Sequence, residues 1–243
     1  MAPVFFVGKK DGKKRMVQDY RYLNEWTVKN NYLLPLILDI VKNIGTKKVF
    51  TKLDLRWGYN NVRIKEGDRW KVAFTTLEES FEPKIMFFGL TNSPATFQVI
   101  MNEILRDLIN TGKIASFIDD VIIGTEEEGH DEIVEEVIRR MEENDLYVKP
   151  EKCKWKVREV RFLGVVIGKD GIKMEKEKVK AVLDWPILKS VKDVQKFLEL
   201  ANYYRRFIKG FAQIAKPLYE LTRKDQKWKW EVRQEKSFEA LKK

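Results

Sequence analysis

The chain has 243 residues, which is enough for a sizeable core in one or two domains, and 44% hydrophobic with 12% aromatic residues exclude a disordered composition. Lys and Arg number 47 against 37 Asp and Glu, and the resulting charge of +10 favours a polyanionic partner, nucleic acid ahead of membrane. The single cysteine excludes a disulfide framework, and the lack of a signal peptide or a membrane-length apolar stretch fits a cytoplasmic or nuclear protein.

The N-terminal pattern predicts a strand at residues 4–7, the Lys-rich turn "GKKDGKKR" and a returning segment at 16–24, which together form a basic hairpin. A helix follows Pro35 and is closed by Gly45. Residues 48–55 and 71–76 read as strands, and residues 59–64 between them as a helix or a turn.

Residues 92–110 predict one helix, with Pro94 near its start, and residues 114–124 predict a hairpin. Residues 131–144 predict an amphipathic helix, and His130 at its acidic start is interpreted as a surface residue. Two short strands within 157–168, a helix over 175–185 and a helix over 190–210 complete the chain. Ser190 and Asp193 are expected to cap the last helix.

Two adjacent acids interrupt the apolar run "SFIDDVIIG". Asp119 and Asp120 read as the tip of a hairpin, where both carboxylates would lie in water. The alternative is a divalent metal site, because hard cations take oxygen ligands and offset the repulsion between neighbouring carboxylates. The pair alone does not decide between the two readings.

A third acid, Asp54, interrupts the apolar strand in "FTKLDLRWGY". Taken alone, it fits a strand-end acid. Three acids on two strand ends would suit two Mg²⁺ ions about 3.5–4 Å apart, the arrangement used in two-metal phosphoryl transfer.

Six segments, in this order and spacing, resemble the reverse transcriptase of a gypsy-type long-terminal-repeat retrotransposon, with retroviral polymerases as more distant relatives. They are "LDLRWGY", "FFGLTNSPATFQ", "FIDDVIIG", "VKPEKC", "RFLGVVIG" and "FLELANYYRRFIKGFAQIAKPLYEL". The resemblance implies an α+β, right-hand polymerase fold, with fingers, a palm built on an antiparallel sheet, and a helical thumb.

The resemblance also implies an active site. Asp54, Asp119 and Asp120 take the positions of the catalytic, metal-binding acids, and Leu55 would offer a backbone carbonyl to one of two Mg²⁺ or Mn²⁺ ions. Tyr59 falls at the steric gate that selects dNTPs. Phe87 stands where the family usually has Pro, and Trp57 where a small residue is common.

Further residues gain expected roles from the resemblance. The dNTP-binding set includes Lys9, Arg15, Tyr59 and Phe88. The set for an RNA or DNA template with its primer is Arg21, Asn24, Phe162, Leu163, Gly164, Asn202, Tyr203, Arg205 and Arg206. Tyr204 has the helical spacing of a thumb core residue.

The expected organisation is fingers and palm in 1–167, a helical thumb in 168–225 and the start of a connection in 226–243. A ribonuclease H domain is expected to be absent, with ribonuclease H and integrase as partner domains of a longer polyprotein. The expected function is RNA- and DNA-directed DNA synthesis. Two alternatives stay open: an RNA-dependent RNA polymerase, and an inactive fold that binds nucleic acid or acts as a scaffold.

Overall fold

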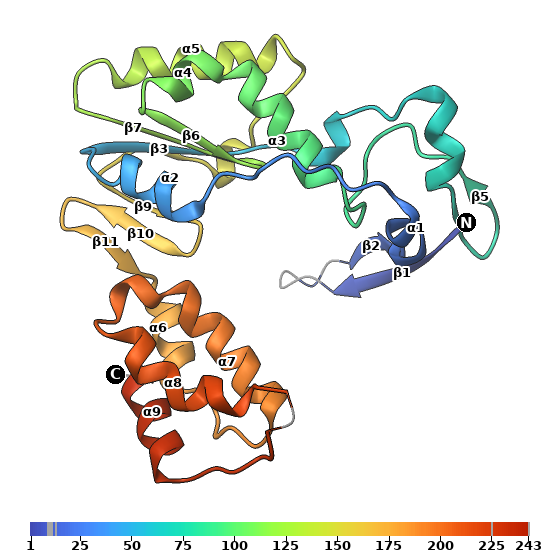
Figure 1. Cartoon of the computed structure of the whole chain (residues 1–243). Coiled ribbons are helices and arrows are strands. Elements are labelled where there is room, and N and C mark those ends of the chain that lie inside the picture. Colours follow the sequence, from blue (N-terminus) through green and yellow to red (C-terminus); the bar gives the residue numbers. More distant parts are fainter. Residues whose placement is uncertain (9–11, 13, 225, 243) are drawn as a thin grey trace. The chain divides into compact units, whose positions relative to one another are not determined.

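The structure is a computed structural model, and it describes residues 1–243 except 9–11, 13, 225 and 243. The chain divides into two compact units, Met1–Ile172 and Lys173–Lys243 (Figure 1). No helix within the described ranges is long and apolar enough to cross a membrane.

The first unit contains a four-stranded antiparallel sheet in the order β6-β7-β3-β8. These strands are β3 (Val49–Asp54), β6 (Ile114–Phe117), β7 (Asp120–Thr125) and β8 (Lys154–Val157). Three helices cover one face of this sheet in Figure 1: α3 (Ser93–Ile104), α4 (Arg106–Asn110) and α5 (His130–Glu142). Helix α2 (Ile37–Ile44) also contacts β6 and β7.

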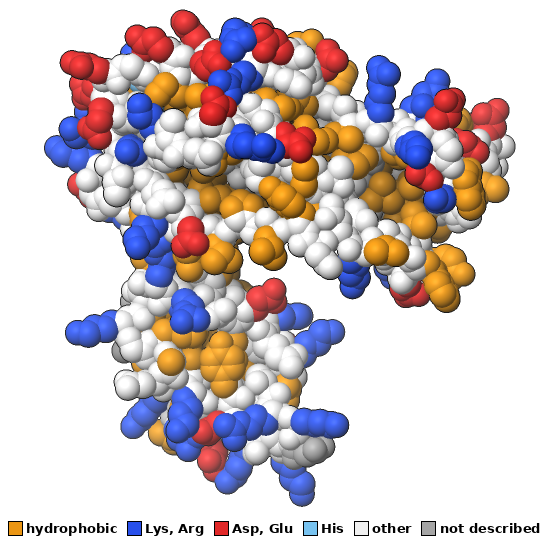
Figure 2. Space-filling view, turned by 45° about the horizontal axis from the view of Figure 1, so that its top comes forward, with side chains coloured by type: hydrophobic (Ala, Val, Ile, Leu, Met, Phe, Trp, Pro, Cys, Tyr) orange, Lys and Arg blue, Asp and Glu red, His pale blue; other side chains and the backbone are white. Residues whose placement is uncertain are grey.

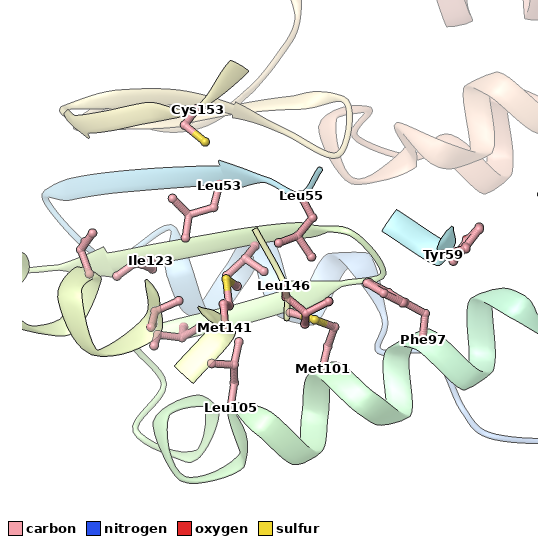
Figure 3. Packing of buried hydrophobic residues seen from close by; sticks show 14 of the residues in the cluster. Leu53, Leu55, Tyr59, Phe97, Met101, Leu105, Ile123, Met141, Leu146 and Cys153 are labelled. Carbon is pink, nitrogen blue, oxygen red and sulfur yellow. The ribbon is translucent and has the colours of Figure 1, made fainter. Parts of the chain in front are cut away.

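The core of this sheet lies between its strands and α3. In Figure 3, Leu53 and Ile123 extend from the strands and Met101 and Phe97 extend from helix α3 into one core, and all four side chains are fully buried. Burial of large apolar side chains of this kind contributes about 1.5–3 kcal/mol each. The strand ends that carry the acids are therefore held on a rigid, packed layer.

A second sheet in this unit has the order β2-β1-β4-β5, with β1 parallel to β4 and the other pairs antiparallel. Its strands are β1 (Ala2–Gly8), β2 (Lys14–Gln18), β4 (Phe74–Thr75) and β5 (Ser80–Phe81). The expected basic hairpin is confirmed by the pairing of β1 with β2, and the short helix α1 (Arg21–Trp26) follows it.

A third sheet has the order β11-β10-β9. Its strands are β9 (Glu159–Phe162), β10 (Val165–Gly168) and β11 (Gly171–Met174). The two strands expected within 157–168 are confirmed, whereas β11 was not expected.

The second unit is helical, with α6 (Lys176–Leu183), α7 (Val191–Tyr203), α8 (Phe211–Leu221) and α9 (Val232–Lys242). Its core includes Phe197 of α7, Leu218 of α8 and Phe238 of α9. The expected cap of α7 is confirmed, because the Asp193 amide donates to Ser190 Oγ at 3.2 Å and the Ser190 hydroxyl donates to Asp193 Oδ2 at 2.8 Å.

Two expected helices are shorter than their patterns suggested. The helix expected over 92–110 is interrupted at Leu105, where φ −109° and ψ 12° leave the helical region and let the side chain fill the core. The helix expected over 190–210 ends at Tyr203, and Arg205–Phe207 form a 3₁₀ turn after the buried Tyr204. Tertiary packing overrides helix propensity at both points.

His130 is not on the surface, contrary to expectation. Its side chain is 1% exposed. Its ring nitrogens lie 2.7 Å from Thr51 Oγ1 and 2.7 Å from Thr125 Oγ1. The acidic residues that follow it suggested an exposed helix start, but the sheet hydroxyls provide partners that make burial possible.

Candidate active site

The three acids lie near one another, two at the ends of paired strands and one in the adjoining turn. Asp54 is the last residue of β3, Asp120 is the first residue of β7, and the two are directly opposite in the antiparallel register. Asp119 lies in the turn that joins β6 to β7, after Ile118. The hairpin and the strand end expected from the sequence therefore come together in space.

The turn itself is strained. Ile118 has φ 58°, in the left-handed region that β-branched residues rarely adopt. A backbone of this kind costs about 1–3 kcal/mol and persists only when the surrounding structure enforces it. The strain lies one residue before Asp119, so the tip of the hairpin is a specified conformation and not a loose loop.

Burial and, secondarily, the neighbouring acids act on the carboxyl group of Asp119. Asp119 is exposed as a residue, but its carboxyl group is crowded: a Cβ placed on Gly58 would lie 3.5 Å from Asp119 Oδ2. Burial raises the pKa of Asp119, the negative charges of Asp120 and Asp54 raise it further, and Lys52 partly offsets them. The negative charges of Asp54 and Asp119, which no ion pair offsets among the described contacts, favour a cation at this site.

Lys52 is a member of this site that the sequence reading missed. Its Nζ lies 2.9 Å from Asp120 Oδ1 and 5.8 Å from the ring centroid of Phe162. The signal was present, because Lys52 stands two residues before Asp54 on one strand and so shares its face. In this structure the ammonium group neutralises Asp120.

The donor set has the right chemistry for a hard divalent cation, since carboxylate oxygens and backbone carbonyls are the ligands that such ions prefer. Asp54 and Asp119 lie close enough to interact by charge, whereas Asp120 is paired with Lys52. Across the described part of the chain, no three His, Cys, Asp or Glu side chains converge on one point. The oxygen donors of the three acids therefore suit a divalent cation by their chemistry, although the three side chains do not converge on one point here.

A row of contacts links the acids to the residues expected to bind a nucleotide. The ring of Tyr59 lies 4.9 Å from Phe88 and 5.7 Å from Phe97, measured between centroids. The Arg15 guanidinium lies 5.2 Å from the centroid of Phe88. Burial, and secondly the charge of Asp119, raise the pKa of Tyr59 to about 12. Lys9 lies outside the described residues.

Comparison with known proteins explains this constellation. Residues 7–167 match the family described as "Reverse transcriptase (RNA-dependent DNA polymerase)". The chain belongs to the reverse transcriptase family. The resemblance expected from the sequence and the α+β polymerase fold are thereby confirmed.

Two kinds of relative support the assignment. The chain is 35% identical to the Transposon Tf2-3 and Tf2-4 polyproteins of Schizosaccharomyces pombe over 242 residues, 99% of this chain and 18% of each polyprotein. It is similar to a foamy viral protease-reverse transcriptase solved with double-stranded DNA, with a TM-score of 0.89, 29% identity, and coverage of 99% of this chain and 43% of that one. The foamy viral protein solved with an RNA/DNA hybrid gives a TM-score of 0.83 and 28% identity, over 99% of this chain and 33% of that one.

The unusual residues of this reverse transcriptase have structural roles. Phe87 packs edge-on against Phe74 at 6.1 Å and joins the core under the second sheet, a site where Pro would fill less space. Trp57 has φ 66° and is 61% exposed, and the Arg56 guanidinium stacks over its ring at 4.4 Å. Phe87 thus contributes to the core, and Trp57 makes an exposed cation–π contact.

The residues expected to contact template already have intramolecular partners. Arg21 pairs with Asp19 at 2.5 Å, on the surface. The side chain of Asn24 donates to the Gly89 carbonyl at 2.8 Å and accepts from the Thr91 amide at 2.9 Å. Asn24 therefore braces the segment that follows Phe88.

The segment expected to hold the primer is the turn between β9 and β10. Leu163 and Gly164 form this turn with φ values of 46° and 78°, and both are partly exposed. Phe162 is 1% exposed and is paired with Val165 in the β9–β10 ladder, so its side chain packs inward.

The second unit carries the remaining expected residues and most of the charge. Asn202, Tyr203, Arg205 and Arg206 are exposed, whereas Tyr204 is buried, as its helical spacing suggested. Residues 173–243 hold 19 Lys and Arg against 10 Asp and Glu, a net +9 of the chain's +10. Figure 2 shows these cationic side chains projecting from the unit. Nearly all of the net positive charge of the chain therefore lies in this unit.

Proposed function

We propose that this chain is the polymerase core of a reverse transcriptase, which adds dNTPs to a primer 3′-hydroxyl on an RNA or DNA template. The observation that carries the proposal is the register of Asp54 opposite Asp120, with Asp119 beside them, inside the range that matches the family. The family match indicates the class of reaction, and the three acids are the side chains that would bind the metal ions for it.

Two Mg²⁺ or Mn²⁺ ions would be held by Asp54, Asp119, Asp120 and the Leu55 carbonyl. Bound there, the ions would favour ionisation of the primer hydroxyl and neutralise charge on the phosphates. Asp120 would exchange its contact with Lys52 for this role. A bound cation would offset the repulsion that the Asp119 carboxylate meets from Asp120 and Asp54.

The nucleotide would lie against the row formed by Arg15, Phe88 and Tyr59. Arg15, with Lys9, would contact the triphosphate, because guanidinium groups bind phosphate through two parallel hydrogen bonds. The ring of Tyr59 would meet a 2′-hydroxyl and so exclude rNTPs, and Phe97 supports that ring from behind.

Each unit holds residues that we propose to contact the template–primer. We assign fingers and palm to 1–167, the thumb to 168–225 and the start of a connection to 226–243. The proposed contacts are Arg21, Asn24, the Phe162–Gly164 turn, Asn202, Tyr203, Arg205 and Arg206. The net charge of +9 in residues 173–243 supports a phosphate-binding role for the second unit. Further domains of a polyprotein, ribonuclease H and integrase among them, are the proposed partners.

The test is primer extension on poly(rA)–oligo(dT) with dTTP and Mg²⁺, comparing the wild-type chain with Asp119→Asn. The substitution removes a metal-binding charge and keeps the side-chain volume, so extension should be abolished while template–primer binding persists. Wild-type rates in the variant would refute the assignment of Asp119. Binding that falls steeply with salt, with no extension by the wild type, would support the inactive binding fold instead.

A further inference from the structure

Gln98 of helix α3 is a buried polar side chain that lies behind the catalytic hairpin. It is 0% exposed. Its Oε1 accepts from the Ile118 amide at 2.7 Å, and its Nε2 donates to the Ser116 carbonyl at 3.2 Å. These two backbone groups fix which end of the amide is oxygen, since one is a donor and the other an acceptor.

The two bonds span Phe117, so a single side chain holds the backbone on both sides of that residue. The Ile118 amide belongs to the residue with φ 58°, which lies directly before Asp119. A left-handed β-branched residue keeps its conformation only when its surroundings enforce it. The hydrogen bond that the Ile118 amide donates to the buried Gln98 side chain does so here.

The other side of the turn is held by β3. The Leu55 amide donates to the Asp119 carbonyl at 3.4 Å, a longer contact than the one made by Gln98. The tip of the hairpin is thus held from the helix by Gln98 and from the strand by Leu55. Because Asp54 is next to Leu55 on β3, these two contacts set the position of Asp119 relative to Asp54.

Gln98 is itself well anchored. Its Nε2 also donates to Asn102 Oδ1 at 2.9 Å, and the Asn102 amide donates to the Tyr32 hydroxyl at 2.6 Å. Phe97 and Met101, on the same helix, are fully buried in the core. A side chain held in this way is pre-organised and can transmit the rigidity of the helix to the turn.

We infer that Gln98 is a positioning residue for nucleotide addition: through the backbone of the β6–β7 turn it fixes the placement of Asp119 opposite Asp54. The inference rests on the proposed function. Gln98 is buried away from solvent and so touches neither substrate nor template. Its loss should therefore change the rate of the chemical step and leave template–primer affinity unchanged.

The experiment is single-turnover dTTP addition on poly(rA)–oligo(dT) by Gln98→Met, which keeps the side-chain length and removes both hydrogen bonds. The single-turnover rate constant should fall roughly 10- to 100-fold, the scale of a misplacement near 1 Å. The burst amplitude, which counts active molecules, should stay the same. Gln234→Met is the matched control, because Gln234 is a buried glutamine of α9 in the other unit.

Each outcome has a distinct meaning. A rate constant equal to wild type, or a loss confined to the burst amplitude, would overturn the inference and leave the proposed function standing. A wild-type chain that extends no primer would overturn the proposed function itself. If Gln98→Met yields no folded protein, Gln98→Glu serves in its place. The carboxylate of this variant keeps an acceptor for the Ile118 amide but places its second oxygen against the Ser116 carbonyl oxygen, and two acceptors repel. The single-turnover rate constant should again fall, with the burst amplitude unchanged.

Discussion

Replacement of His130 by Ala should destabilise the first unit, because His130 joins two strands to α5 through a closed set of hydrogen bonds. The Thr125 hydroxyl donates to the Glu126 carbonyl, so Thr125 Oγ1 accepts from His130 Nδ1. His130 Nε2 then accepts from the Thr51 hydroxyl, whose oxygen also accepts from the Lys156 amide at 3.1 Å. These donors and acceptors assign the neutral form of the His130 ring, with its proton on Nδ1.

The expected loss of unfolding free energy in His130→Ala follows from these contacts. The variant loses two neutral hydrogen bonds, and the two threonine oxygens keep one partner each, so the bonds account for about 1–3 kcal/mol. Loss of the packed ring raises the total to about 2–4 kcal/mol of unfolding free energy. For a unit of this size the melting temperature should fall by roughly 4–16 °C. Glu135→Ala, an exposed change on the same helix, is the control.

The same network predicts a pH dependence. Burial lowers the pKa of His130 below its usual 6.5, with Asp131 acting against this shift and Lys156 adding to it. As the pH falls through 6.5, His130 is protonated more readily in the unfolded chain than in the folded one. The free energy of unfolding therefore has its full value above pH 6.5 and declines below it. In His130→Ala this decline should be smaller.

Because His130 is the sole histidine of the chain, its imidazole proton gives one assignable NMR signal. The titration midpoint of that signal in the folded protein should lie below 6.5. A midpoint at or above 6.5, together with a melting temperature in His130→Ala equal to wild type, would refute the buried network and return His130 to the surface.

Two further predictions concern the nucleotide site and the second unit. Tyr59→Val should raise the use of rNTPs relative to dNTPs roughly tenfold or more, measured by competition in primer extension. Tyr59→Phe keeps the ring and should keep the exclusion, and no change in the valine variant would remove Tyr59 as the gate. Ser190→Ala removes the cap of α7 and should cost about 1 kcal/mol in urea unfolding, whereas Ser190→Thr should retain most of it. Equal midpoints for the alanine variant and wild type would show that the cap contributes nothing.

The sequence alone determined the features that rest on local pattern. The apolar runs that Asp54 and Asp119–Asp120 interrupt indicated that the acids lie at strand ends, and six ordered segments indicated the family. The Ser190–Asp193 cap and the β9 and β10 strands were predicted for the same reason. Apart from the order of the six segments, each of these signals lies within a few neighbouring residues, where backbone geometry relates spacing directly to structure.

Only the tertiary structure decided the contacts between residues far apart in the chain. His130 is buried because Thr51, 79 positions away, offers it a hydroxyl, and an acidic local sequence cannot reveal that partner. Gln98 reaches Ile118, 20 positions along the chain, and Lys52 meets Asp120 from the neighbouring strand. The helix break at Leu105 has the same origin. In each case the free energy comes from burial and pairing across the fold, which spacing along one segment does not encode.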